Sequence, residues 1–184
     1  MAELSRRLVA EALGTGLLVA TVIGSGIMAE RLTEDSALAL LANTLPTSAI
    51  LVVLVTVLGP LSGAHLNPAV SLVMALRRAL PGGETVLYVL SQLIGAVLGT
   101  MLANAMFALP LLEASQHVRT GPNQWLAEAV AIARSMTNTF SGIRPADLPG
   151  FIAAELCGAV VALIFMNWLL RGSGEAAKTR EAQP

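Results

Sequence analysis

The residues best placed to do chemistry lie in one short polar stretch, Ser62–Val70, with the sequence SGAHLNPAV. The stretch lies between two apolar runs, and its glycine and proline break the helical pattern there. Asn67 is a favourable helix N-cap, and Pro68 suits the first helical position. A broken backbone at membrane depth is tolerated only where protein buries it or it lines a water-filled cavity. The stretch therefore predicts a loop that dips into a membrane, with the Asn67 amide on a path and the positive end of a half-helix aimed at it.

The sequence contains no residue pattern that is typical of catalysis, metal binding or nucleic-acid binding. We see no Ser/His/Asp or Cys/His constellation, no phosphate-binding glycine loop and no paired catalytic carboxylates, so we expect neither an enzyme nor a cofactor. His65 has no second histidine or carboxylate at ligand spacing, so no metal site is expected, and we interpret it as a wall residue. The single Cys157 excludes an internal disulfide, and a net charge of −1 suggests no nucleic-acid partner.

The composition indicates which elements position the loop. Of 184 residues, 55% are hydrophobic and only 12% are charged, with a mean hydropathy of +0.72. A soluble domain has about a quarter of its residues charged, so this is an integral membrane protein. Four apolar runs are long enough to cross a bilayer. They are Leu8–Ala29, Leu38–Gly59, Thr85–Ala108 and Gly150–Leu170.

Two shorter segments do not qualify as spans. Asn67–Leu76 is long enough for half a bilayer, and Trp125–Phe140 is only moderately apolar. Basic residues at positions 6, 7, 77 and 78 and in the C-terminal tail fall on one side if the helices alternate, whereas the Glu30–Ala37 loop is mainly acidic. This asymmetry predicts a multi-pass protein of the cell membrane with both termini cytoplasmic.

The chain also repeats itself. Residues 88–97 match residues 151–160 at a constant offset, and residues 8–13 match residues 125–130. Two similar halves, each with a broken segment near the bilayer midplane, are typical of inverted-repeat membrane folds. The predicted fold class is an all-α membrane bundle of four spanning helices and two short re-entrant or interfacial helices.

Three stretches resemble the major intrinsic protein (aquaporin and glyceroporin) family. Residues 10–15 (AEALGT) are similar to the family's first helix, residues 62–70 to its first pore loop with the Asn-Pro-Ala signature, and residues 91–96 to its third helix. The resemblance implies a passive channel for water and small neutral solutes, commonly a homotetramer in a lipid bilayer. It implies that Asn67, Pro68 and Ala69 line the pore, with His65 and Gly63 on its wall.

The second half departs from the family pattern. Only one Asn-Pro-Ala is present. From Ala129 onward the chain resembles the family's segment just after the second signature. This resemblance implies that Ala129 lines the pore. Most of the fourth helix, the fifth helix and the second signature are missing. We therefore expect a first repeat over residues 1–108, an extracytoplasmic loop over 109–124, a truncated second repeat over 125–171 and a disordered cytoplasmic tail over 172–184.

The resemblance also implies a selectivity constriction. Thr47 falls at a filter position that is often aromatic, and Val130 falls where water-selective members place an arginine. A wider filter without that charge suits glycerol-like molecules or undissociated metalloid hydroxides such as arsenite. The alternative is a non-conducting remnant, or an assembly partner of full-length subunits, because the missing helices leave the path unsealed.

Three acidic residues lie inside apolar segments, where an ionisable group is usually functional. Glu11 and Glu128 are interpreted as loop anchors whose carboxylates accept hydrogen bonds from backbone N–H groups. For Glu155, an exposed position near the membrane surface is equally possible.

Overall fold

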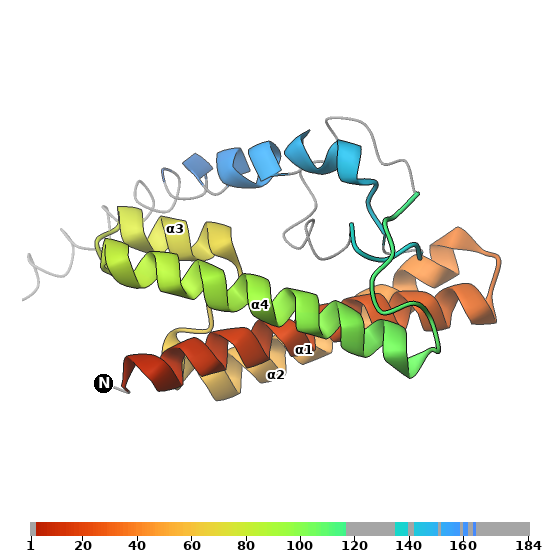
Figure 1. Ribbon diagram of the computed structural model, residues 1–184, viewed down its shortest axis with the longest axis horizontal. Coiled ribbons are helices and arrows are strands. Elements are labelled where there is room, and N and C mark those ends of the chain that lie inside the picture. The colour runs from red at the N-terminus through yellow and green to blue at the C-terminus, as the bar shows by residue number, and fades with distance from the viewer. Residues whose placement is uncertain are drawn as a thin grey trace, which may run out of the picture.

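All regular secondary structure in the described part of the chain is helical. The computed structural model describes residues 3–116, 135–139, 142–150, 152–158, 160, 161 and 164. No strand occurs in these ranges, which agrees with the predicted all-α class. Figure 1 shows the elements, which are α1 (Leu4–Leu32), α2 (Ser36–Ser62), α3 (Pro68–Leu76), α4 (Gly82–Met106) and the 3₁₀ helix η1 (Pro145–Asp147).

Three of the four predicted spans coincide with long helices. Helices α1, α2 and α4 have 29, 27 and 25 residues, and α1 and α2 extend beyond the apolar runs at both ends. Hydropathy marks only the apolar part, whereas a helix continues into its polar flanks. Residues 152–158 of the fourth span are helical, and residues 165–170 lie outside the described ranges. The short segment predicted to end at residue 140 is not helical over 135–139, where the chain turns.

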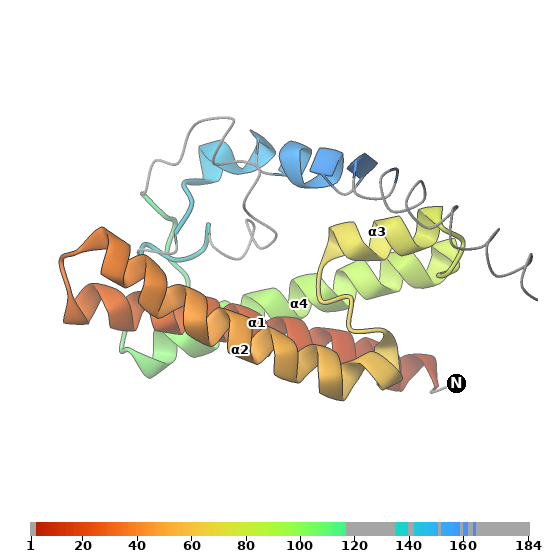
Figure 2. The ribbon, with the colours of Figure 1, turned by 180° about the vertical axis from the view of Figure 1, so that it is seen from behind.

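Helix α1 lies between α2 and α4, and α3 packs on α4 (Figures 1 and 2). Near the start of α1, Arg7 pairs with Glu84 near the start of α4, with Nη1 and Oε2 2.8 Å apart. At the other end, Arg31 donates to the Phe107 carbonyl. Contacts at matching ends make α1 and α4 parallel. Helix α2 runs back along α1, since Asn43 donates to the carbonyl of Val22.

The α1–α4 contact depends on small residues in both helices. A Cβ added to Gly95 would collide with the carbonyl oxygen of Ala12, and one added to Gly99 with that of Gly16. Both pairs are spaced four residues apart, as in small-xxx-small helix contacts of membrane proteins. The two backbones therefore approach as closely as the chain allows.

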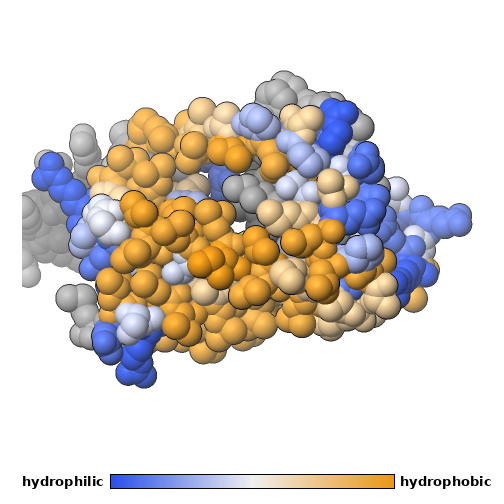
Figure 3. Space-filling model, viewed as in Figure 1, coloured by the Kyte–Doolittle hydropathy of each residue, from blue (hydrophilic) through white to orange (hydrophobic). Residues whose placement is uncertain are grey.

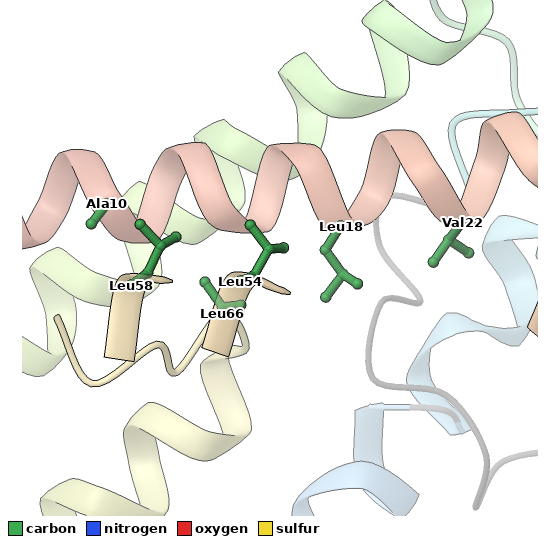
Figure 4. Packing of buried hydrophobic residues seen from close by; sticks show 6 residues of the cluster. All are labelled: Ala10, Leu18, Val22, Leu54, Leu58 and Leu66. Atoms are coloured by element: carbon green, nitrogen blue, oxygen red, sulfur yellow. The ribbon is translucent and has the colours of Figure 1, made fainter. Parts of the chain in front are cut away.

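The α1–α2 contact is aliphatic. Leu54 and Leu58 of α2 meet Ala10, Leu18 and Val22 of α1, and Leu66 of the following loop joins the same cluster (Figure 4). Leu66 is only 4% exposed, so it anchors the loop to the face that α1 presents. A Cβ at Gly14 would overlap the Leu66 side chain, so this glycine makes room for it.

The surface has the pattern of a membrane protein. Among the described residues, three helices are long and apolar enough to cross a bilayer, namely α1, α2 and α4. Figure 3 shows a broad hydrophobic band with hydrophilic residues gathered toward both ends of the molecule. In α2, Val52, Val57 and Leu45 are more than 60% exposed, which suits contact with lipid chains rather than water.

Candidate functional site around the Asn67 loop

The loop between α2 and α3 lies level with the middle of the neighbouring helices. Ser71, in the first turns of α3, accepts a hydrogen bond from Gln92, the eleventh of the 25 residues of α4. Asn67, the N-cap of α3, lies one turn further toward the centre of α4. With 1.5 Å per residue, Asn67 lies about 20 Å along α4, close to the midpoint of a spanning helix.

The loop backbone has an unusual conformation. Gly63, Ala64 and Leu66 all have positive φ, at 91°, 46° and 52°. For alanine and leucine this left-handed region is unfavourable by about 1 kcal/mol or more. Such a backbone persists only where surrounding groups hold it, and the structure supplies a buried carboxylate for that purpose.

Glu11 of α1 holds the loop. Its Oε1 accepts from the Ser62 hydroxyl at 2.6 Å and from the His65 N–H at 3.0 Å. Its Oε2 accepts from the Leu66 N–H at 2.7 Å and from Nε2 of Gln92 at 2.8 Å. The side chain is fully buried. Four donors around one carboxylate compensate its removal from water and fix two consecutive loop residues at once.

A second set of polar groups ties α3 to the loop. Nε2 of Gln92 also donates to the Ser71 hydroxyl at 2.9 Å, and Nδ1 of His65 lies 3.1 Å from the same oxygen. Gln92 is 1% exposed and Ser71 fully buried. His65 is also buried, with its ring centroid 5.2 Å from that of Tyr88.

Tyr88 connects this network to the end of the bundle. Its hydroxyl donates to the Ser62 carbonyl at 2.9 Å and accepts from Nε of Arg7 at 2.8 Å. The Arg7 guanidinium also lies 5.2 Å from the Tyr88 ring centroid and pairs with Glu84. The last residue of α2 is thus fixed to α1 and α4 before the loop begins.

Asn67 is the N-cap of α3. Its Oδ1 accepts from the Ala69 N–H at 2.7 Å, and Pro68 begins the helix. Asn67 is half-buried, whereas Ala69 is 5% exposed. Capping uses only the oxygen of the amide, so its NH₂ group, which has two donors, points away from the cap.

The other residues predicted from sequence fall in several places. Gly63 is exposed and ends α2 in the left-handed conformation. Thr47 is half-buried in α2, and its hydroxyl donates to the Asn43 carbonyl. It lies about 20 Å along the helix from Ser62, so a filter there is separate from Asn67. The predicted site residues Glu128, Ala129 and Val130 lie outside the described residues.

Sequence reasoning missed one group that holds the loop and left another undecided. Gln92 completes the Glu11 site, and a polar side chain in an apolar span was the signal that could have found it. For Glu155 the sequence leaves open a structural role or an exposed position near the membrane surface. In the structure Glu155 is half-buried, and its Oε1 is buried.

The grooves on the outer face of α1 and α4 do not suit a polar solute. One of about 330 Å³ is lined by Leu13, Gly16, Leu98 and other apolar residues of the two helices. Another, of about 440 Å³, lies near Met28. The polar groups that could guide a solute are gathered instead around Asn67.

Comparison with known proteins gives a consistent family. The sequence model of the major intrinsic protein family matches residues 1–141. Aquaglyceroporin AqpS of Rhizobium meliloti (strain 1021) is 54% identical over 214 aligned positions, which cover 92% of each chain. The glycerol uptake facilitator protein of Streptococcus pneumoniae (strain ATCC BAA-255 / R6) is 34% identical over 55% of this chain and 44% of its own. Aquaporin NIP1-1 of Arabidopsis thaliana is 34% identical over 56% of this chain and 34% of its own.

The alignment with AqpS also contains positions at which this chain has no residue. Its 214 positions exceed the roughly 169 residues that 92% of this 184-residue chain amounts to. About 45 aligned positions therefore have no counterpart in this chain. This number of residues corresponds to about two helices and a loop. It agrees with the missing segments that were expected because the sequence has a single Asn-Pro-Ala motif.

Proposed function

This chain belongs to the major intrinsic protein family, and from that premise we propose that it is a passive channel for small neutral solutes. The observation that carries the proposal is the position of Asn67. Its amide lies at mid-depth of the helices, on a loop held open by Glu11, with the NH₂ group free of the helix cap. Glycerol is the solute class favoured by the relatives, whose names include an aquaglyceroporin and a glycerol uptake facilitator.

The physical basis of conduction is hydrogen bonding without charge transfer. A neutral hydroxyl leaving water needs a donor in the middle of the bilayer, and the Asn67 amide supplies one. The N-terminus of α3 carries a partial positive charge at the same depth, which disfavours cations. No step requires a cofactor or a chemical reaction of the solute.

We further propose that Thr47 and Val130 set the width of the outer constriction. Thr47 leaves more space than an aromatic side chain, and Val130 adds no positive charge. Such a constriction admits polyols and extends the proposed solutes to undissociated metalloid hydroxides such as arsenite.

A second candidate function is a non-conducting assembly partner of full-length subunits. One observation favours it, namely the absence of about 45 aligned positions relative to AqpS. A channel wall built from fewer helices needs another chain to complete it. This candidate predicts no flux from the purified protein alone.

Stopped-flow swelling of proteoliposomes separates the two candidates. The purified chain is reconstituted, and glycerol entry is compared with that of empty vesicles. A channel gives flux well above the empty vesicles, and flux equal to theirs contradicts the proposal. Arsenite uptake, measured in the same vesicles, tests the extended solute range.

The Asn67→Asp variant tests the role assigned to the amide. Aspartate keeps the oxygen that caps α3 but has no NH₂ donor, so helix stability is retained while solute binding is lost. We expect glycerol flux to fall at least fivefold with an unchanged unfolding temperature. The matched control is Asn43→Asp in α2, which loses an amide donor outside the loop. Equal flux in wild type and Asn67→Asp would refute this role.

A further inference from the structure

Two grooves lie on the surface of the first half of α1, one on each side of the same ridge. One groove lies between α1 and α4 and the other between α1 and α2, and each has a volume of about 330 Å³. Val9 and Leu13 line both grooves. These two residues are exposed and lie about one turn apart on one face of α1. They form the ridge that separates the grooves.

The two grooves have the chemistry and the dimensions of acyl-chain sites. Every residue that lines the α1–α4 groove is apolar, and Leu58 and Leu61 form the α2 side of the other groove. Each groove follows residues 5–13 or 9–17 of α1, which is about 12 Å of helix. The three helices that form them are long and apolar enough to cross a bilayer. In a membrane, these grooves therefore face lipid chains.

Polar groups occur at one end of this ridge. Ser5 and Arg6 line the α1–α2 groove, and both are exposed. Arg6 precedes Val9 by almost one turn, and helical side chains lean toward the start of their helix. A long arginine side chain covers apolar surface with its stem and keeps its charge at the membrane–water interface. Its planar guanidinium also matches the geometry of a phosphate group.

The adjacent arginine has a different environment. Arg7 pairs with Glu84 at 2.8 Å and donates to the Tyr88 hydroxyl at 2.8 Å, so its charge is used to join α1 to α4. Arg6 forms no ion pair with any residue that the structure describes. A cation without a protein partner thus stands at the head of two apolar grooves.

We propose that this face of α1 binds one phospholipid with an anionic headgroup. Its two acyl chains lie in the two grooves, on either side of the ridge of Val9 and Leu13, and its phosphate contacts the Arg6 guanidinium. A zwitterionic headgroup carries its own cation, which competes with Arg6 for the phosphate, so an anionic lipid binds more tightly. The site needs only the membrane position of the three helices, and it does not depend on conduction by the chain.

Native mass spectrometry of the full chain in detergent tests the headgroup. The probes are phosphatidylglycerol and phosphatidylcholine with identical acyl chains. We expect Arg6→Gln to weaken phosphatidylglycerol binding about fivefold, as for one basic residue at an anionic membrane surface, and to leave phosphatidylcholine binding unchanged. Arg77→Gln is the matched control, because Arg77 is exposed at the same end of the bundle and lines neither groove. Equal binding of the two lipids to wild type, or an equal loss in both variants, overturns the proposal.

A second variant tests the place of the acyl chains. Leu98→Trp fills the α1–α4 groove from an exposed position, so we expect weaker phosphatidylglycerol binding with an unchanged unfolding temperature. Leu90→Trp, at an exposed position of α4 that lines neither groove, should bind as wild type does. Unchanged binding in Leu98→Trp overturns the proposal. A wild-type dimer that forms without added lipid and is lost in Leu98→Trp also overturns it, because a second copy then covers this face.

Discussion

Two carboxylates, one in each half of the molecule, have opposite surroundings. Glu11, in the first half, receives four donors and lies among α1, α4 and the loop. Glu155, in the second half, is half-buried, and its Oε1 has no hydrogen-bond partner among the described residues. The first half is thus held by saturated polar contacts and close helix packing. The comparison teaches that a carboxylate fixes a loop only where protein donors saturate both of its oxygens.

Removing Glu11 should have the largest effect. Glu11→Ala leaves the N–H groups of His65 and Leu66 buried without their acceptor, and each orphaned group is unfavourable by about 1–3 kcal/mol. We expect a loss of at least about 3 kcal/mol in stability and flux no higher than that of empty vesicles. Thermal unfolding in detergent measures the loss of stability, and vesicle swelling measures the flux.

Glu84→Ala is the matched control for that variant. Glu84 is also a carboxylate in contact with α1, through Arg7, but its side chain is 28% exposed. An exposed ion pair contributes only about 0–1 kcal/mol. If both variants unfold at the same temperature, the saturated network around Glu11 is not what holds the first half together.

Disturbing the α1–α4 contact should have an intermediate effect. Gly95→Ala places a Cβ against the Ala12 carbonyl oxygen, so the two helices must separate. We expect a destabilisation of about 1–3 kcal/mol, as for overpacked cores. Gly83→Ala, in the same helix but with no atom near the added Cβ, should leave the unfolding temperature unchanged or raise it. Similar unfolding temperatures for the two variants would count against a close helix contact.

The smallest effect is expected where the two halves meet near the end of α4. Thr137 is buried, and its hydroxyl donates to Oδ1 of Asn104 at 3.1 Å. Thr137→Val should lower stability by about 1 kcal/mol, because one buried hydrogen bond is lost. Thr56→Val, which removes a hydroxyl from an exposed helical site, should change little. A null result for Thr137→Val would show that this contact does not couple the halves.

Much of the first half could be predicted from the sequence because its signals are local. Apolar length located α1, α2 and α4, and the order of Gly63, Asn67 and Pro68 located the loop and the start of α3. These features depend on residues close together in the chain. Each is fixed by backbone chemistry that a single segment already contains.

The partners across helices could not be predicted in the same way. Hydropathy does not say which faces of α1 and α4 meet, so the place of Gln92 and Tyr88 beside the loop was not foreseen. The sequence also did not decide between a structural role and an exposed position for Glu155, which is half-buried in the structure. Its surroundings depend on contacts between segments far apart in the chain, and no local signal encodes those contacts.

The saturation of Glu11 has a consequence for biogenesis. Three of its four donors come from Ser62, His65 and Leu66, but the fourth belongs to Gln92, which emerges later from the ribosome. Tyr88, on the same later helix, secures the Ser62 carbonyl. Until that helix has left the translocon, the re-entrant segment lacks part of its polar support in lipid. Stable insertion of the segment therefore depends on the arrival of α4 in the membrane.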